Sequence, residues 1–184
     1  TPIQPRFAES NLFLISAGGP GALSFNEFNP IFNRNRVAAQ VSGLVGEHDT
    51  WGEDIIVSGI YDRFSFSIGQ SYYTTDGFRT NADEEDLLVN AFFQVELTSR
   101  ASLQLEYRYR NAEFGDLRQQ FFEDAFDATM RNEIERHYFR VGGRHAFTPD
   151  SILIGNFSYQ DADADQTSSE FVPGAFAKFG FPGT

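Results

Sequence analysis

The 184-residue chain contains no cysteine, which excludes disulfide bonds and metal sites with thiolate ligands. Basic residues are scarce: 14 Lys and Arg stand against 26 Asp and Glu, for a formal net charge of −12. This balance argues against nucleic-acid binding driven by phosphate contacts. No apolar run approaches the 18 residues of a transmembrane helix, and no signal-peptide pattern opens the chain.

Phenylalanine and glycine are abundant, with 21 and 16 residues, whereas tryptophan occurs once. The mean hydropathy is nevertheless −0.36, which is polar. In residues 87–110 the apolar side chains occur at alternate positions, with one break at 98–100. Alternation over two runs of about eight to ten residues predicts two half-buried strands joined by a tight turn. A polar average combined with such alternation is typical of a transmembrane β-barrel.

The same alternation predicts further strands along the chain. The predicted strands cover residues 36–45, 54–61, 64–73, 87–97, 102–110, 136–147 and 151–160. Single-chain bacterial barrels normally have an even number of strands, so either 11–17 or a stretch within 171–181 supplies an eighth, or the barrel continues elsewhere. The predicted fold is therefore all-β: an antiparallel up-and-down transmembrane β-barrel of seven or eight strands, complete or part of a larger barrel.

Three regions follow from the pattern. Residues 1–35 are rich in Pro and Gly and are predicted to be an irregular linker or a plug-like N-terminal segment. Residues 36–160 hold the barrel strands with their turns and loops, and 161–184 form an acidic loop and a Gly/Pro/Phe-rich tail. The first residue is Thr rather than Met, so we expect a processed chain or a piece of a longer protein.

The connections alternate in length. Long loops are expected at 46–53, 74–86 and 111–135, and short turns at 62–63, 98–101 and 148–150. Outer-membrane barrels have short periplasmic turns and long extracellular loops, and strands of about ten residues tilted ~45° span their apolar band. Within 111–135, apolar residues recur near helical spacing and predict a short amphipathic helix, with a mobile surface loop as the alternative. These residues are Leu117, Phe121, Ala125 and Met130.

The alternation also assigns side chains to two faces of the predicted sheet. The residues predicted to face the lumen, as selectivity groups or as structural ion pairs, are Gln94, Glu96, Gln104, Glu106, Arg108, Arg110, Arg140 and Arg144. The residues predicted to face lipid are Phe64, Phe66, Ile68, Val89, Phe93, Val95, Leu103, Leu105, Tyr107 and Phe157. Aromatic residues near the predicted strand ends fit interfacial girdles.

Evidence for a metal site or for catalysis is weak. Asp161, Asp163 and Asp165 have the D-x-D-x-D spacing of calcium loops, but Gln166 and Val172 replace the required Gly and acid. We interpret this weak metal candidate as a solvated acidic loop. The histidines share no metal-ligand spacing, and no catalytic motif surrounds a serine. No enzymatic activity and no cofactor are therefore expected.

Three segments of the sequence resemble one bacterial family: 1–36, 54–79 and 144–161, of which FNEFNP and TDGFR are the most specific parts. Members of that family fuse tetratricopeptide repeats to an outer-membrane β-barrel, often labelled TonB-dependent-receptor-like. The resemblance covers nearly all of residues 1–165. It implies that this chain is the start of a larger barrel, without the repeats and the later strands. No catalytic residues follow from the resemblance.

The leading functional hypothesis is a porin-like outer-membrane β-barrel, or barrel segment, for passage, uptake or export of a solute or polymer across the outer membrane of a Gram-negative bacterium. The expected partners are the lipid bilayer, lipopolysaccharide, and other envelope subunits or the remainder of the protein. The acidic run 83–86 is a candidate site for binding divalent ions near lipopolysaccharide headgroups. Two alternatives are a structural or assembly protein of the cell envelope without transport, and a soluble carbohydrate-binding β-sandwich.

Overall fold

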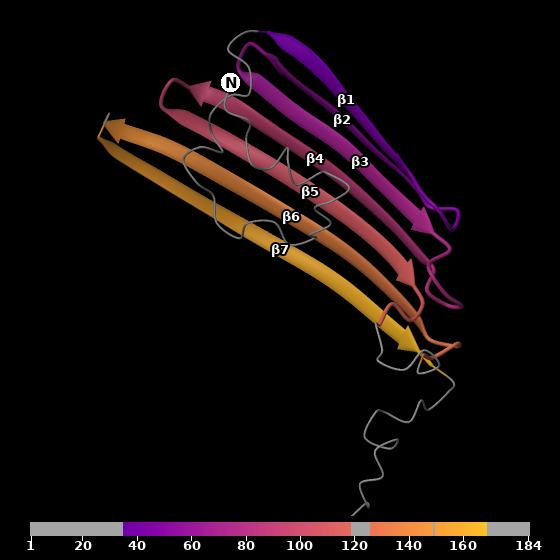
Figure 1. Ribbon diagram of the computed structural model, residues 1–184. Coiled ribbons are helices and arrows are strands. Elements are labelled where there is room, and N and C mark those ends of the chain that lie inside the picture. The colour runs from indigo at the N-terminus through magenta and orange to yellow at the C-terminus, as the bar shows by residue number, and fades with distance from the viewer. Residues whose placement is uncertain (1–34, 119–125, 149, 169–184) are drawn as a thin grey trace, which may run out of the picture.

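The computed structural model describes residues 35–118, 126–148 and 150–168, and these build one antiparallel sheet (Figure 1). The strands are β1 (Arg36–Val45), β2 (Trp51–Tyr61), β3 (Phe64–Thr75), β4 (Glu84–Thr98), β5 (Ala101–Phe114), β6 (Arg131–Thr148) and β7 (Ser151–Thr167). Each strand pairs with the next in the sequence, so the predicted all-β, up-and-down arrangement is confirmed. No helix among the described residues is long and apolar enough to cross a membrane.

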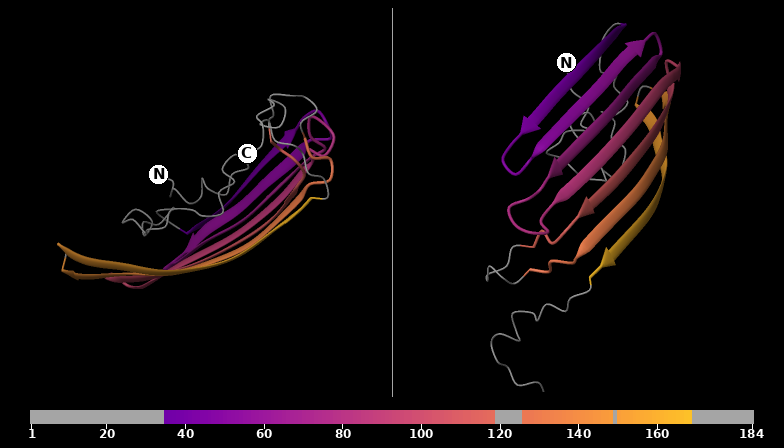
Figure 2. Two further views of the ribbon diagram at one scale, coloured as in Figure 1. Left: turned by 90° about the horizontal axis from the view of Figure 1, so that it is seen from below. Right: turned by 90° about the vertical axis from the view of Figure 1, so that its right-hand side faces the viewer.

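Among the described residues, the sheet is a single curled layer whose edge strands are β1 and β7 (Figure 2). The part of the chain that the structure describes is therefore not a closed barrel. Because every neighbouring pair is antiparallel, β1 and β7 run in the same direction. Closure by antiparallel pairs alone would require an odd number of additional strands between these two edges.

Six of the strands extend beyond their predicted ends, and the main extensions lie at the long-loop end of the sheet. Trp51, predicted to lie in a loop, is in β2, and the stretch 161–167, predicted to be an acidic loop, is the end of β7. At this end of β7 the outward positions are acidic instead of apolar, and Ala162 and Ala164 occupy the polar face. The pattern of apolar outward and polar inward residues therefore ends there, although the backbone pairing continues. The hydrogen-bonded ladder, not the side-chain pattern, defines these ends.

The insertion between β5 and β6 is shorter than predicted, because residues 111–114 and 131–135 belong to the two strands. The predicted amphipathic helix is wrong where the structure describes this loop: Leu117 and Met130 lie in non-helical backbone. Phe121 and Ala125 lie outside the described residues, as do the linker 1–34, the tail 169–184 and both proposed eighth strands.

Turn chemistry at the other connections agrees with the hairpin topology. His48 and Asp49 both have positive φ, 58° and 49°, at the centre of the turn closed by Thr50 N–H donating to the carbonyl of Glu47 at 3.2 Å. Asp62 also has a positive φ of 53° in the two-residue connection between β2 and β3. Its N–H donates to Oδ1 of Asn35 at 2.7 Å. Asp tolerates this left-handed conformation better than most residues.

Side chains divide between a polar face and an apolar face, because directly paired residues share a face. On β2 to β6 the polar face is the buried one: Asn90, Gln94, Gln104 and Glu106 are each at most 6% exposed. The apolar side chains of Ile56, Leu88 and Phe92 are buried among them. The apolar face is open, with Leu105 41% and Phe157 66% exposed. This distribution is the reverse of that in a water-soluble domain, where the apolar face would be covered.

Candidate functional site

The polar face carries opposite charges on its two halves. On β5 and β6 it presents five arginines, Arg108, Arg110, Arg136, Arg140 and Arg144, against one carboxylate, Glu106. On β2 to β4 it presents the carboxylates Asp54, Glu84, Asp86 and Glu96 and no basic residue. This face therefore has an acidic half and a basic half, which together impose an electric field across the sheet.

Glu106 stands at the centre of the basic half and is 1% exposed. It accepts a hydrogen bond from Nε of Arg108 at 2.9 Å on its own strand. On the adjacent strand, Nη2 of Arg140 lies 2.6 Å from Oε2 of Glu106. Both arginines are also buried, at 3% and 2% exposure, so this triad is a desolvated charge cluster rather than a surface ion pair.

A second ion pair joins the two halves of the polar face. Arg110 on β5 donates from Nε to both carboxylate oxygens of Asp86 on β4, at 3.0 and 3.1 Å, and from Nη2 at 2.5 Å. Asp86 is 3% exposed. A planar guanidinium that meets both oxygens of a carboxylate fixes the geometry of the pair as well as its charge.

The apolar face forms a band across the strands. One row of paired residues runs Val37, Gly59, Phe66, Phe93, Leu105, Val141 and Phe157. Along β4 the outward residues are apolar from Leu87 to Leu97, about 33 Å of strand at ~3.3 Å per residue. At a tilt of ~45° that length rises about 23 Å, close to the apolar band of outer-membrane barrels.

At the long-loop end of this band lie aromatic residues that form hydrogen bonds. Trp51 packs against Tyr72 with ring centroids 5.3 Å apart, and Tyr72 donates to Glu85 at 2.8 Å. Further along the sheet, Tyr107 Oη and His137 Nδ1 are 2.9 Å apart. Rings that are apolar on one side and hydrogen-bonded on the other suit a boundary between an apolar and an aqueous medium.

Beyond the aromatic residues, the outward face becomes acidic. The acidic rim consists of Glu85, Glu113, Glu133, Glu135, Asp161, Asp163 and Asp165. Arg131 also lies at this level and forms an ion pair with Asp83 in the loop before β4. The apolar band and the acidic rim therefore occupy successive levels of one face.

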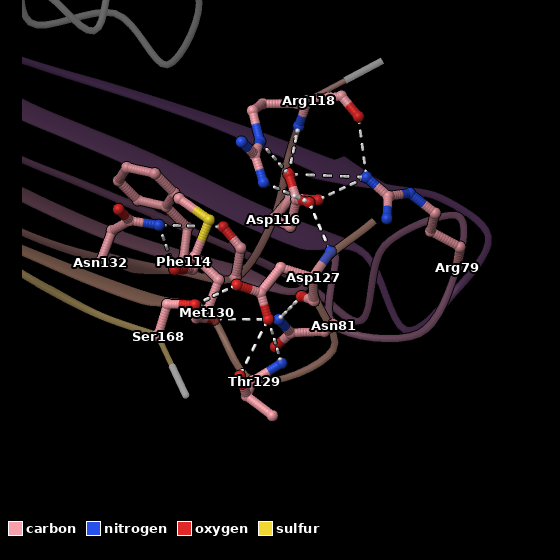
Figure 3. A network of polar contacts seen from close by, with 11 residues as sticks. Arg79, Asn81, Phe114, Asp116, Arg118, Asp127, Thr129, Met130, Asn132 and Ser168 are labelled. Atoms are coloured by element: carbon pink, nitrogen blue, oxygen red, sulfur yellow. Dashed lines mark hydrogen bonds and ion pairs between the residues drawn. The ribbon is translucent and has the colours of Figure 1, made fainter. Parts of the chain in front are cut away.

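At the long-loop end, the loop before β4, the loop after β5 and the end of β7 are joined by one network of polar contacts (Figure 3). Asp116 is fully buried and accepts from Nε and Nη2 of Arg118 at 2.9 and 3.0 Å. It also accepts from the backbone N–H of Asp127 at 2.9 Å. Asn81 donates from Nδ2 to the carbonyls of Asp127 and Met130, which ties the two loops together.

These contacts affect the ionisation of the loop carboxylates. The side-chain hydrogen bonds from Arg118, opposed by burial and assisted by two backbone N–H groups, hold the pKa of Asp116 well below its usual range. The hydrogen bond from Ser168, together with those from Thr129, lowers the pKa of Asp127. Both carboxylates are therefore ionised in the network at neutral pH, and Asp116 stays ionised into strongly acidic conditions.

Replacement of Asp116 by Asn is expected to lower the free energy of unfolding of the loop end by about 1–3 kcal/mol at pH 7, because charge-assisted bonds are lost. Since the folded-state pKa is depressed, this stabilisation is complete above the unfolded pKa of about 4 and is lost as pH falls toward the folded value. The difference between wild type and variant should shrink below about pH 4. Hydrogen exchange of the Asp127 amide measures this difference in stability. The control is Asp76→Asn, at an exposed loop position.

Gly115 allows the two loops to approach. A Cβ at this position would lie 2.1 Å from the carbonyl oxygen of Asn81, and the neighbouring N–H of Asp116 donates to that oxygen at 2.6 Å. Gly115→Ala should therefore cost about 1–3 kcal/mol and expose the Asp116 amide to hydrogen exchange. Gly155→Ala is the matched control, because its Cβ would meet no atom within 4 Å. Equal effects of the two substitutions would contradict the close approach.

The register assigns the predicted site residues to the two faces of the sheet. Every residue predicted to face the lumen lies on the polar face, and every residue predicted to face lipid lies on the apolar face. That the polar face meets a lumen and the apolar face meets lipid stays a prediction. The weak metal candidate is not a loop: Asp161, Asp163 and Asp165 lie on β7, where alternate residues are ~7 Å apart. Among the described residues no group of three potential ligands is close enough to hold a metal ion.

The sequence did not identify three participants in these sites. Arg136 was omitted from the predicted lumen residues, although it continues the four-residue spacing of Arg140 and Arg144. Asp86 was assigned to the end of a loop, because its strand begins in an acidic run without alternation. The Asp116 network joins loops distant in the sequence, and no local pattern announces it.

Comparisons of the chain with known protein families, curated proteins and solved structures found no match. The resemblance described above therefore stays a prediction. The residues that the structure describes contain strands and turns but no pair of helices like a tetratricopeptide repeat.

Proposed function

We propose that this chain forms part of the wall of an outer-membrane β-barrel through which a solute or polymer passes, as in the family it resembles. The observation that carries the proposal is the distribution of side chains: one face buries charged groups beside a few apolar ones, and the other exposes most of the large apolar groups. Acyl chains would cover the apolar face, and the polar face would line the lumen. Such a wall works by binding and steric selection, without catalysis.

The levels of the apolar face support this orientation. A band about 23 Å high, then aromatic rings with hydrogen-bonded polar groups, then an acidic rim match acyl chains, interface and headgroups in turn. The long loops then lie at the outer surface, where the acidic rim meets lipopolysaccharide through divalent cations. The short turns, such as Asp62-Arg63, lie on the periplasmic side.

The directions of the two edge strands determine how many further strands would close the barrel in this proposal. β1 and β7 run in the same direction, so the remaining wall contributes an odd number of strands. This parity fits the start of a larger barrel, and it fits a barrel of eight strands equally. A soluble carbohydrate-binding sandwich is less well supported, because the described residues supply one sheet and nothing packs a second sheet on its apolar face.

Vesicle flotation tests the membrane location. The full chain, refolded in the presence of phosphatidylcholine vesicles, is expected to float with them, to resist extraction by alkaline carbonate, and to change its mobility on gels with heating. A chain that stays in the aqueous fraction and remains folded there would contradict the proposal.

A structural role in the envelope is the second candidate, and one observation favours it. The network around Asp116 holds two loops and the end of β7 in a fixed arrangement, which suits a surface for a partner protein. Conductance in a planar lipid bilayer separates the two roles. A chain that inserts and conducts supports passage, whereas one that inserts without conducting supports assembly.

A further inference from the structure

The polar face of β5 and β6 carries a ladder of arginines, defined here as Arg108, Arg110, Arg136, Arg140 and Arg144. On β6 three of them follow one another at every fourth residue. At ~3.3 Å per residue they are about 13 Å apart and cover about 26 Å of the strand. The ladder therefore covers most of the length of about 33 Å that the apolar band covers along β4 on the opposite face.

Two carboxylates contact the arginine ladder. Glu106 contacts Arg108 and Arg140, and Asp86 contacts Arg110. Arg136 is directly opposite Arg110, Arg144 lies further along β6 toward the short turn, and no other acidic residue lies on the polar face of β5 or β6. The arginine ladder is thus strongly positive on a chain whose net charge is −12.

The neighbouring strand adds neutral polar groups and no charge. On the polar face of β7, Asn156, Ser158 and Gln160 lie beside Gly142, Arg140 and Tyr138 respectively. Amides and hydroxyls both donate and accept hydrogen bonds, so they bind polar groups of either kind. Guanidinium groups, in contrast, match the two oxygens of carboxylate, phosphate or sulfate.

We propose that the arginine ladder is an anion-binding surface that selects solutes bearing carboxylate, phosphate or sulfate groups. The partly exposed Arg136 and Arg144 meet the solute, and the buried arginines add positive charge behind them. This inference rests on the proposed function, because it names the class of solute that passes along the polar face. The acidic half on β2 to β4 repels the same solutes, so the field across the sheet guides them along β5 and β6.

The test is binding of a fluorescent trianion, 8-hydroxypyrene-1,3,6-trisulfonate, to the full chain in zwitterionic detergent micelles, followed by fluorescence polarisation. Citrate, pyrophosphate and sulfate are expected to displace the probe, and their order distinguishes carboxylate from phosphate and sulfate ligands. Neutral maltose and cationic spermidine are expected not to displace it. Arg136→Gln should weaken binding about tenfold, the effect of losing about 1.4 kcal/mol.

Two variants keep this result interpretable. Arg131→Gln makes the same change on the same strand but on the opposite face, and should leave the affinity within about twofold. Arg136→Lys retains the charge and should recover most of the affinity. Equal losses from Arg136→Gln and Arg131→Gln, or no saturable binding by wild type, would overturn the inference.

Failure of the inference and failure of the proposed function give different results. A chain that floats with vesicles but does not bind the trianion contradicts only the anion site. A chain that binds the trianion but does not float contradicts the membrane location and supports the arginine ladder as the anion site of a protein in water.

Discussion

Replacing Glu106 by Gln is expected to lower the free energy of unfolding by about 3–5 kcal/mol. The carboxylate is buried between Arg108 and Arg140, at 2.9 and 2.6 Å, and both guanidinium groups are themselves desolvated. A neutral amide of the same size leaves the two positive charges close together without the negative charge between them. Urea unfolding of the refolded protein in micelles measures the loss.

Glu113→Gln is the matched control for this prediction. Glu113 lies on the same strand, on the opposite face, where it is exposed. Surface substitutions of this kind usually change stability by less than about 0.5 kcal/mol. A loss below about 1 kcal/mol in Glu106→Gln would mean that the triad contributes little, and that the polar face is more hydrated than its burial indicates.

Replacing Leu105 by Arg is expected to cost about 2–4 kcal/mol in a bilayer, because its position lies near the middle of the apolar band. Leu105 pairs with Phe93 and is 41% exposed in the isolated sheet. Leu97→Arg, near the short-turn end of the band, should cost only about 0–1 kcal/mol. Unfolding titrations in vesicles compare the two variants.

If the loss of stability depends on the depth of the substituted position in the band, the medium on the apolar face is lipid. If the apolar face meets water, an exposed Leu→Arg change should alter stability by less than about 0.5 kcal/mol at either position. If it meets a second sheet of a soluble core, both changes should be severely destabilising, and no gradient along the strand is expected. Either pattern would contradict a membrane location.

The sequence predicted the strands and their faces well where one face is apolar and the other polar. In β5, the alternation of Leu103 and Leu105 with Gln104 and Glu106 was sufficient, because a strand repeats every two residues. The order of the strands followed from the short connections, such as Asp62-Arg63, which leave little choice but antiparallel neighbours.

The rest of the fold depends on features without a local pattern. At the acidic ends of β4 and β7 the outward positions are acidic rather than apolar, and only backbone pairing extends the strands there. The loop after β5 was predicted as a helix from the spacing of its apolar residues, but Asp116 and Gly115 bind it instead to the loop before β4. Such contacts join residues far apart in the sequence.

The charged triad was predicted only in part. Glu106, Arg108 and Arg140 were each predicted on one face, but their contacts require the register between β5 and β6, which pairs Glu106 with Arg140. A shift by one residue would move Arg140 to the opposite face, beside the apolar band. The ion pairs of the polar face therefore depend on the same register that keeps the apolar face continuous.

The absence of cysteine makes one measurement especially direct, because a single introduced cysteine carries the only spin label. Phe157 and Ser158 are neighbours on β7, both exposed, and lie on opposite faces. In vesicles, electron paramagnetic resonance should find a label at 157 accessible to oxygen and shielded from nickel(II) ethylenediaminediacetate. A label at 158 should show the reverse. Equal access of the nickel complex to both labels would contradict a sheet with one face in lipid.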